Sequence, residues 1–519
     1  MYRITGLVFA LALILGQKQL QAQVFPKENS VLTYRIIGFS FAAVPNCASY
    51  VIEIANGNLS GEMLFKKNII ISERSDANRH IAEVPAFGQD YTWRVSAIHS
   101  NGKTTASPMH HFSTGYCELA DTTCTRFRLT ANSGRYDGAY VFLDQSKVMY
   151  DMKGLPVWYL PNIDDVANER AMPRDMKVTS RQTITFLASG MPYEISYDGK
   201  VWWKSNLEDS NANGKQGYFH HEFTRLTNGH YMGMGMEPAE LHLKNMQAGQ
   251  LPPGMASNVQ GDNLPPLPPS LKFMSGKLLE YDEKGNEVWS WMSSSYFENE
   301  GSDFYYNKLP DGTVNTDVHD NSFYFDEKKS VIYVSYKNIN RIVKIKYPEG
   351  KVLAAYGPRF RPGLQPENSG LFCGQHCVKR SEEGYLYLYN NNSCNAVRFP
   401  RVVILKESEL SNDSLELVWE YECNNAGIAQ DENRSGRSVT GGSAEELQDG
   451  SILVCMGTPC SKVFIVSRDK KELWSGFSEV WNNNLHKWQM QALYRASIIR
   501  DRNELSKLIW KSQEGTMNK

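Results

Sequence analysis

Three histidines stand at comparable places in the chain, each just before a strand-like stretch. His376 lies in G-Q-H-C-V-K-R-S-E-E-G and His221 in H-E-F-T-R-L-T-N-G, and each precedes the glycine of the next turn by eight residues. His319 opens H-D-N-S-F-Y-F-D, which also leads into a strand-like pattern. The chain has only 11 histidines, so this recurrence indicates a shared site. Imidazole can bind a metal, carry a proton or attack an electrophile.

The residues around these histidines favour an anion over a metal ion. A catalytic zinc takes three protein ligands and a water, but the only carboxylates in step with the histidines are Glu222 and Asp320. Lys337 on the following strand would repel a cation, and no C-x-x-C pair occurs in the chain. Together with Asn321, the set predicts donors around a tetrahedral oxyanion, with one imidazole free to attack. We therefore predict no metal site.

The first residues read as an export signal. Residues 1–22 carry a positive charge at Arg3, a short apolar run from Leu7 to Leu15 and a small residue, Ala22, at the expected cleavage point. The apolar run is too short to span a bilayer, and no later stretch reaches spanning length. We expect a periplasmic or secreted protein with no membrane partner.

The cysteines would then face an oxidising compartment, where disulfides form. Their number, nine, is odd, so internal pairing leaves at least one thiol. Cys373–Cys377 and Cys455–Cys460 are candidate local pairs, but spacing alone does not assign them.

Length and charge narrow the classes further. A chain of 519 residues is expected to form two or more domains. Its 55 Lys and Arg nearly balance its 57 Asp and Glu, which argues against a nucleic-acid partner.

Residues 24–116 predict a small N-terminal β-sandwich. A-S-Y-V-I-E-I-A (Ala48 to Ala55) and Y-T-W-R-V-S-A-I (Tyr91 to Ile98) alternate apolar and polar residues, as half-buried strands do. The pattern Y-x-W-R-V, an N-G turn and a closing F-S-T resembles a fibronectin type III module.

Residues 125–519 repeat a β-rich unit, in which an Asp- or Gly-containing turn leads to a Trp or aliphatic residue. Six units recur, which predicts an all-β, six-bladed β-propeller with the tryptophans packing its blades. The strand-like stretch Gln491 to Ile499 is expected to complete a blade. The six turn units are Asp151–Trp158, Tyr197–Trp203, Asp282–Trp289, Tyr347–Leu353, Ser414–Trp419 and Asp469–Trp474.

The segment from Val318 to Ile345, V-H-D-N-S-F-Y-F-D-E-K-K-S-V-I-Y-V-S-Y-K-N-I-N-R-I-V-K-I, followed by A-A-Y-G-P and G-Q-H, resembles the bacterial arylsulfate sulfotransferase family. The resemblance covers most of residues 125–500. It implies a periplasmic six-bladed propeller with a small N-terminal β-domain. It also implies transfer of a sulfuryl group from an aryl sulfate donor to a phenol acceptor through a sulfated histidine, without the nucleotide donor PAPS or another cofactor. A homodimer is left open.

Carried onto this sequence, the resemblance makes His376 the nucleophile and His319 and His221 its catalytic partners. Asn321 and Lys337 are expected to bind substrate, and His220 is the register alternative to His221. The family's arginine falls on Lys337, which keeps the charge but loses the bidentate fork. Further pocket candidates are Thr440, Ser443, Arg437 and Tyr494.

Two other functions are consistent with a propeller. A non-catalytic secreted propeller would bind a carbohydrate or protein partner and turn over no aryl sulfate. A quinone-dependent dehydrogenase would need a carboxylate-lined calcium and cofactor site, which the sequence does not offer.

Overall fold

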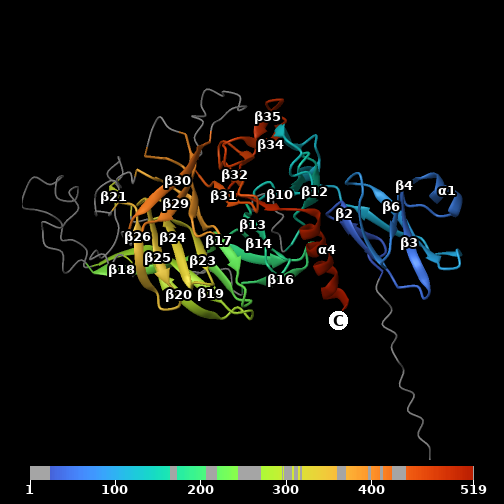
Figure 1. Cartoon of the computed structure of the whole chain (residues 1–519), viewed down its shortest axis with the longest axis horizontal. Helices are drawn as coiled ribbons and strands as arrows, with labels where there is room; N and C mark the ends of the chain where they lie inside the picture. Colours follow the sequence, from blue (N-terminus) through green and yellow to red (C-terminus); the bar gives the residue numbers. More distant parts are fainter. Residues whose placement is uncertain are drawn as a thin grey trace, which may run out of the picture. The chain divides into compact units, whose positions relative to one another are not determined.

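The chain is all-β, with many small sheets and few helices (Figure 1). The computed structural model describes residues 24–163, 172–205, 219–242, 270–294, 296, 307–308, 314–315, 318–358, 370–394, 399–409, 413–423 and 440–517. The predicted signal peptide, residues 1–22, lies outside them. In these ranges no helix has the length and apolar character needed to cross a membrane.

The chain divides into two compact units. The first comprises residues up to Val31 together with Ile37–Val84 and Asp90–Ser113. The second comprises Leu32–Ile36, Pro85–Gln89 and everything from Thr114 onward. Two short segments of the predicted N-terminal sandwich therefore cluster with the second unit.

The first unit holds two sheets. One has the order β1-β8-β6-β3-β4 with β7 paired to β6, and the other pairs β2 with β5. The elements are β1 (Ser30–Leu32), β2 (Ile36–Ser40), β3 (Cys47–Asn56), α1 (Glu62–Lys67), β4 (Ile69–Ser75), β5 (Arg79–Glu83), β6 (Asp90–His99), β7 (Thr104–Ala106) and β8 (His110–Thr114).

Alternation places the core of this unit. On β3, Tyr50, Ile52 and Ile54 are buried while the residues between them are half-buried, as the two-residue period of a strand requires. Phe39 on β2 contacts Trp93 on β6 with ring centroids 4.9 Å apart. The two sheets therefore share an aromatic core.

The second unit contains six antiparallel sheets of at least four strands each (Figure 1). The first is β12 (Pro156–Tyr159)-β11 (Val148–Asp151)-β10 (Tyr140–Leu143)-β36 (Ala496–Ile499); the second is β13 (Arg174–Val178)-β14 (Ile184–Ala188)-β15 (Met191–Ile195)-β16 (Val201–Lys204); the third is β17 (Phe219–Arg225)-β18 (Tyr231–His242)-β19 (Ser270–Tyr281)-β20 (Glu287–Met292). The fourth is β23 (Asp320–Asp326)-β24 (Val331–Tyr336)-β25 (Arg341–Lys346)-β26 (Lys351–Tyr356); the fifth is β27 (His376–Arg380)-β28 (Leu386–Asn390)-β29 (Arg401–Glu407)-β30 (Leu415–Glu422); the sixth is β31 (Ser443–Glu446)-β32 (Ile452–Cys455)-β33 (Lys462–Val466)-β34 (Glu472–Asn482)-β35 (Lys487–Met490), with β9 (Thr125–Asn132) paired to β34.

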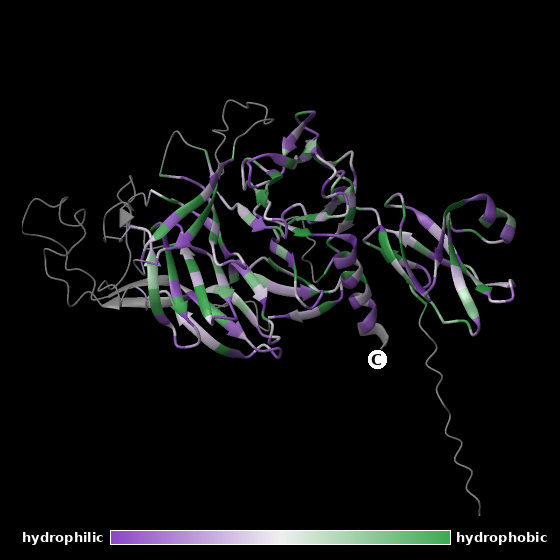
Figure 2. Ribbon diagram, in the orientation of Figure 1, coloured by the Kyte–Doolittle hydropathy of each residue, from purple (hydrophilic) through white to green (hydrophobic). Residues whose placement is uncertain are grey.

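Three smaller features complete this unit: the two-stranded pair β21 (Asn307–Lys308) and β22 (Val314–Asn315), the 3-10 turn η1 (Glu118–Ala120), and the C-terminal helix α4 (Arg502–Met517). Along the six sheets, hydrophobic and hydrophilic residues alternate, so the strands are banded in Figure 2.

Each of the six predicted turn units leads into the fourth strand of one sheet, which confirms the repeat. On four of these strands, a tryptophan donates its indole N–H to a backbone carbonyl of the next sheet. The pairs are Trp158 with Tyr197 (2.8 Å), Trp289 with Pro348 (2.7 Å), Trp419 with Arg468 (2.9 Å) and Trp474 with Met152 (2.9 Å). The last pair joins the sixth sheet to the first.

The two ends of the repeat region also meet. The C-terminal strand β36 pairs with β10, so the first sheet combines residues near 140 with residues near 498. This agrees with the expectation that Gln491 to Ile499 completes a sheet. In addition, β9 pairs with β34 of the sixth sheet, and one apolar cluster contains Val141 and Tyr150 together with Leu453 and Trp474.

The first strands of the six sheets are linked in a cycle. Each link is a hydrogen bond from one first strand to the next, and in each a side chain meets a backbone group. The links are Ser497 Oγ to Met176 O (2.6 Å), Phe223 N to Asp175 Oδ2 (3.0 Å), Phe323 N to Glu222 Oε2 (3.1 Å), Val378 N to Ser322 Oγ (3.0 Å), Cys377 Sγ to Ala444 O (3.9 Å) and Ala496 N to Ser443 Oγ (3.3 Å). Residues at the starts of these strands are therefore brought together.

Candidate functional site

The predicted histidines lie where three consecutive first strands begin. His221 is in β17, His319 directly precedes β23, and His376 is the first residue of β27. Tyr494 stands two residues before β36, the first strand of the first sheet. These four residues come from four sheets and meet at one end of the strand cycle.

Ring contacts confirm that these side chains gather. The ring centroids of His221 and His319 are 5.0 Å apart, and those of His221 and Tyr494 are 5.9 Å apart. The ring of Tyr494 also lies 6.4 Å from that of His376. Tyr494 is held in place because its backbone N–H donates to Asp144 (3.1 Å) and its carbonyl accepts from Gly442 N (2.8 Å).

The backbone at these positions is unusual. His221 (φ 61°), His319 (φ 55°) and Cys377 (φ 55°) are all in the left-handed region, which non-glycine residues seldom adopt. The ladders of β17, β23 and β27 each shift register nearby, as at a β-bulge. A bulge bends the strand and changes the direction of its side chains. The strand starts are therefore shaped to present side chains to the site.

His221 and His376 are equally far from the next glycine, but strand pairing shows that they do not occupy equivalent positions in their strands. His376 pairs with Tyr389 in the last pair before its bulge, and the residue at that place in β17 is His220, which pairs with Met234. Equal distance to the turn therefore does not mean equal backbone geometry. Cys377, which had no assigned role, occupies the left-handed position that His221 occupies in β17.

The sixth sheet carries glycines where the third, fourth and fifth sheets carry histidines, and packing explains why. Gly442 has φ 105°, and a Cβ there would lie 2.2 Å from the ring of Tyr389. At Gly441, a Cβ would lie 2.7 Å from Tyr494. Only glycine fits against these two rings.

His376 is held by one hydrogen bond that sets its protonation pattern. It is 1 % exposed, and its Nδ1 lies 2.6 Å from Oδ1 of Asn391. The Asn391 amide is oriented by its Nδ2, which donates to the carbonyl of Gly441 (3.0 Å). Its Oδ1 can only accept, so His376 donates from Nδ1–H. The lone pair of the neutral ring then resides on Nε2.

The surroundings keep His376 uncharged. Burial and, after it, the charge of the nearby Lys337 ammonium lower the pKa of His376 to about 3, against the opposing effect of the Asn391 hydrogen bond. Lys337 follows β24, and its backbone N–H donates to the carbonyl of His319 (2.9 Å). At neutral pH, His376 is therefore a neutral imidazole beside a cation.

His221 is tied to its neighbour His220. The two Nδ1 atoms are 2.6 Å apart, and His220 Nε2 lies 3.2 Å from the carbonyl of Gly235. Because that carbonyl only accepts, His220 carries its proton on Nε2 and accepts from His221 Nδ1–H. Burial, followed by the charges of His220, His319, His376 and Arg174, holds the pKa of His221 well below its usual value. Its Nε2 is thus a proton acceptor.

Asn321 braces the start of the strand that carries His376. It is fully buried, and its Nδ2 donates to the carbonyl of Gln375 (2.7 Å), the residue before His376. Its own carbonyl accepts from Arg495 Nη2 (3.1 Å). One amide hydrogen of Asn321 is therefore committed to the fold.

The remaining predicted pocket residues differ in where they lie relative to the site. Thr440 is exposed and adjoins the site only through Gly441, which contacts Tyr494. Arg437 lies outside the described residues. Ser443 is buried and accepts from Ala496 N (3.3 Å), so it joins two first strands.

A buried charge network, which sequence reasoning missed, supports the site. Arg495 Nη1 donates to Asp175 (2.7 Å) and lies 3.3 Å from Glu222. Lys379 pairs with the same Glu222. Burial alone would raise the pKa of Glu222, but Lys379, Arg495 and Lys177 lower it below its usual value. Glu222 is thus an ion-pair partner of these cations, and is not placed to bind a metal.

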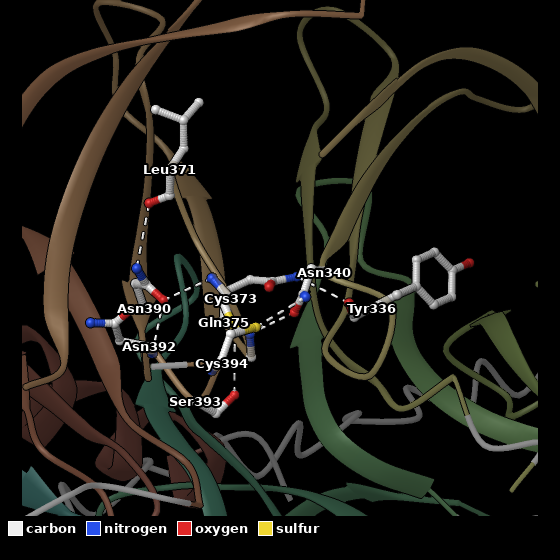
Figure 3. Close-up of a disulfide and its surroundings, with 10 residues drawn as sticks. Tyr336, Asn340, Leu371, Cys373, Gln375, Asn390, Asn392, Ser393 and Cys394 are labelled. Atoms are coloured by element: carbon white, nitrogen blue, oxygen red, sulfur yellow. Dashed lines mark hydrogen bonds between the residues drawn. A yellow bond between two sulfur atoms is a disulfide. The ribbon is translucent and has the colours of Figure 1, made fainter. Parts of the chain in front are cut away.

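A disulfide closes the segment that carries His376 and Asn391 (Figure 3). It joins Cys373, three residues before His376, to Cys394, three residues after Asn391. The candidate pair Cys373–Cys377 is therefore wrong, because Cys377 is a buried thiol whose Sγ contacts the carbonyl of Ala444. Cys455 and Cys460 are not bonded to each other either. Such a bond is typical of proteins outside the reducing cytoplasm.

The segment before His376 is further anchored to the fourth sheet. Gln375 Nε2 donates to Ser335 Oγ (3.2 Å) and to the carbonyls of Tyr336 and Arg341, each at 3.1 Å. Asn340 Oδ1 accepts from Gly374 N (2.8 Å). Figure 3 shows Gln375 and Asn340 beside the disulfide.

Comparison with known proteins identifies part of the chain. Residues 268–463 match the family model described as Arylsulfotransferase (ASST). This part of the chain is similar to that family. The matched residues include His319, Asn321, Lys337 and His376, and Asn391 as well. His221 and Tyr494 lie outside the match and reach the site through the strand cycle.

Other comparisons are distant. No curated protein sequence matches significantly. Among solved structures, a protein of unknown function from Bacteroides caccae is 11 % identical, with 73 % of this chain and 99 % of that chain covered and a TM-score of 0.38. A putative 6-phosphogluconolactonase from Bacteroides fragilis is 10 % identical, with coverages of 88 % and 100 % and a TM-score of 0.27. The periplasmic gluconolactonase of Pseudomonas aeruginosa is 10 % identical, with coverages of 87 % and 99 % and a TM-score of 0.30.

The charge around the histidines of the candidate site is positive. Lys337 and Arg495 lower the pKa of His376 after burial, and Arg174 contributes to the same effect on His221. Across the described ranges, no cluster of three or more His, Cys, Asp or Glu side chains is arranged to hold a metal ion. The arrangement suits an anionic group held near a neutral nucleophile.

Proposed function

We propose that the protein is an aryl-sulfate sulfotransferase that acts through a sulfated His376, without PAPS. One observation carries the proposal: His376 is neutral, and its Nδ1–H is held by Asn391, so the Nε2 lone pair faces away from that bond. A neutral imidazole with a free nitrogen is a nucleophile, and the nearby ammonium of Lys337 suits a sulfuryl group.

The scaffold that we infer for this chemistry is a six-bladed β-propeller. The six sheets, the cyclic links among their first strands and the pairing of β36 with β10 support this arrangement. In a propeller, the first strands surround a central channel. We infer that His221, His319, His376 and Tyr494 stand at one mouth of that channel.

The first half-reaction transfers the sulfuryl group to the protein. Nε2 of His376 attacks sulfur, and the bond between sulfur and the aryl oxygen breaks with its electron pair on the departing phenolate. Lys337 and the free amide hydrogen of Asn321 bind the sulfuryl oxygens. His319 supplies a proton to the phenolate, since His221, with its lowered pKa, is not protonated at neutral pH.

The second half-reaction returns the group to an acceptor. Nε2 of His221 removes the proton of an acceptor phenol, whose oxygen then attacks sulfur. The bond between sulfur and His376 Nε2 breaks, and its electron pair restores the neutral imidazole. The proton taken up by His221 then passes to His319, whose ring centroid lies 5.0 Å away, and replaces the proton given to the leaving phenolate, so a cycle consumes no cofactor.

Export to the periplasm or beyond is part of the proposal. The N-terminal 22 residues have the composition of a signal peptide. The Cys373–Cys394 disulfide supports a compartment outside the cytoplasm.

The test is sulfuryl transfer from 4-nitrophenyl sulfate to phenol, and the assay measures the 4-nitrophenol that is released. His376→Ala and His376→Asn should abolish it, while His486→Ala, at an exposed turn between β34 and β35, should not. Mass spectrometry after acid-free quenching with the donor alone should find a sulfuryl group on the His376 peptide. A protein that transfers nothing and forms no adduct would instead support the non-catalytic binding function.

A further inference from the structure

A hollow lies beside His220 and His221. Its volume is about 340 Å³, within the range typical of small-molecule pockets. Arg174, His220 and His221 line it together with the apolar side chains of Met172, Leu187 and Phe219. The hollow thus shares His221 with the proposed catalytic site. Its apolar side chains can pack against an aromatic ring.

Arg174 is the one guanidinium in the lining, and its charge is not matched by a carboxylate. It is half-buried at the start of β13, and among the described residues it forms no ion pair. Its neighbours differ: Lys177 pairs with Asp175 at 2.6 Å, and Arg495 pairs with Asp175 and Glu222. Partly buried arginines normally have such partners. This one is available to an anion from outside the chain.

Tyr494 connects the hollow to the nucleophile. The Arg174 guanidinium lies 5.0 Å from the centroid of the Tyr494 ring, and the other ring contacts of Tyr494 are with His221 and His376. Tyr494 is only 2 % exposed, yet its hydroxyl has no hydrogen-bond partner within the described part of the chain. A buried hydroxyl without a partner is costly unless a ligand supplies one. It is a second, independent sign of a ligand between Arg174 and His376.

We propose that this hollow is a substrate subsite for phenols and aryl sulfates that carry a carboxylate, and that Arg174 binds the carboxylate. The inference rests on the proposed sulfuryl transfer at His376. The sulfuryl end of the substrate lies at His376 and Lys337, and the ring passes His221 so that its acidic substituent reaches Arg174. A guanidinium fork binds a carboxylate through two parallel hydrogen bonds. Because both half-reactions place the aromatic ring in the same site, the donor and the acceptor share the preference for a carboxylate substituent.

The experiment compares two acceptors that differ only in charge, 3-(4-hydroxyphenyl)propionate and its primary amide, with 4-nitrophenyl sulfate as donor. Wild type should favour the acid in kcat/KM. Arg174→Gln should reduce kcat/KM for the acid about tenfold and leave that for the amide nearly unchanged. Arg174→Lys should retain part of the preference. Arg181→Gln, at an exposed arginine in the β13–β14 turn, is the matched control and should behave as wild type.

Binding provides a readout that does not depend on catalysis. Isothermal titration of His376→Asn protein with the acid and the amide should show tighter binding of the acid, and the added Arg174→Gln substitution should remove the difference. If no variant transfers a sulfuryl group but this binding difference holds, the subsite stands and the proposed function fails. Equal binding and equal turnover of acid and amide in wild type would overturn the subsite. So would an equal loss for both acceptors in Arg174→Gln, which would place Arg174 at the sulfuryl group itself.

Discussion

The hydrogen bond between Asn391 and His376 offers the sharpest test of the proposed nucleophile. The two side chains are 4 % and 1 % exposed, and the bond between them is 2.6 Å long. In Asn391→Ala, Nδ1–H of His376 loses its acceptor in a place with little access to water. An unpaired buried donor costs about 1–3 kcal/mol. If this cost is expressed fully in sulfuryl transfer, kcat/KM falls about 5- to 150-fold.

Asn391→Asp tests the same contact through pH. A carboxylate in this place stabilises the imidazolium, so the pKa of His376 rises from its wild-type value of about 3. A protonated imidazole cannot attack sulfur, so the variant should lose kcat/KM as pH falls through the raised pKa. Wild-type His376 stays neutral from pH 8 to pH 5 and should show no such loss from this group.

The assay is kcat/KM for 4-nitrophenyl sulfate between about pH 5 and 8, and ¹⁵N NMR of the imidazole reports which nitrogen carries the proton. Asn392→Ala is the matched control, because Asn392 is the next residue but donates to the carbonyl of Phe399 (3.1 Å). Full activity in Asn391→Ala, or an Asn391→Asp profile that coincides with that of wild type, would refute the positioning role.

Three further predictions concern neighbouring groups. Replacing Cys373 and Cys394 together by serine opens a bond spanning 21 residues and should lower the free energy of unfolding by about 3 kcal/mol, measured in urea; no change would contradict this. The pKa of His376 is lower in the folded protein than in the unfolded protein. As pH falls, this imidazole therefore takes up a proton in the unfolded state before it does so in the folded state. As pH falls from about 6.5 toward 3, wild type should lose about 1.4 kcal/mol per pH unit relative to His376→Asn, measured as the difference between their unfolding curves. Lys337→Met should lower kcat/KM about tenfold and raise the pKa of His376, whereas Lys337→Arg should retain activity; equal rates in all three proteins would exclude Lys337 from the site.

Local patterns were sufficient to predict most of the strands. The alternation in Ala48–Ala55 and Tyr91–Ile98 corresponds to β3 and β6, and the six turn units each precede a fourth strand. These features depend on neighbours within a few residues, where a period of two and a turn residue act directly on the backbone. The tryptophans that join the sheets were recognisable for the same reason, since they recur at one place in the repeat.

The candidate site was predictable only in part. His376, His319, His221 and Tyr494 do meet, because each lies within two residues of the start of a first strand. Asn391 lies 15 residues after His376 in a run of three asparagines, and nothing in that run distinguishes it from Asn390 and Asn392. Its role depends on the pairing of β27 with β28, which brings two positions 15 residues apart within 2.6 Å.

The residue types of this protein already specify much of its chemistry: imidazoles and an ammonium suited to an anion, a repeat that forms sheets, and a family resemblance in residues 318–345. Three features depend on the folded chain. At the bulges, His220 takes the ladder position that His376 has in β27, and His221 takes that of Cys377. Cys373 bonds to Cys394 rather than to Cys377. Arg174 stands beside Tyr494 with no carboxylate partner among the described residues. Each arises from contacts between distant segments and from burial, which shift pKa values and choose partners in ways that no local pattern encodes.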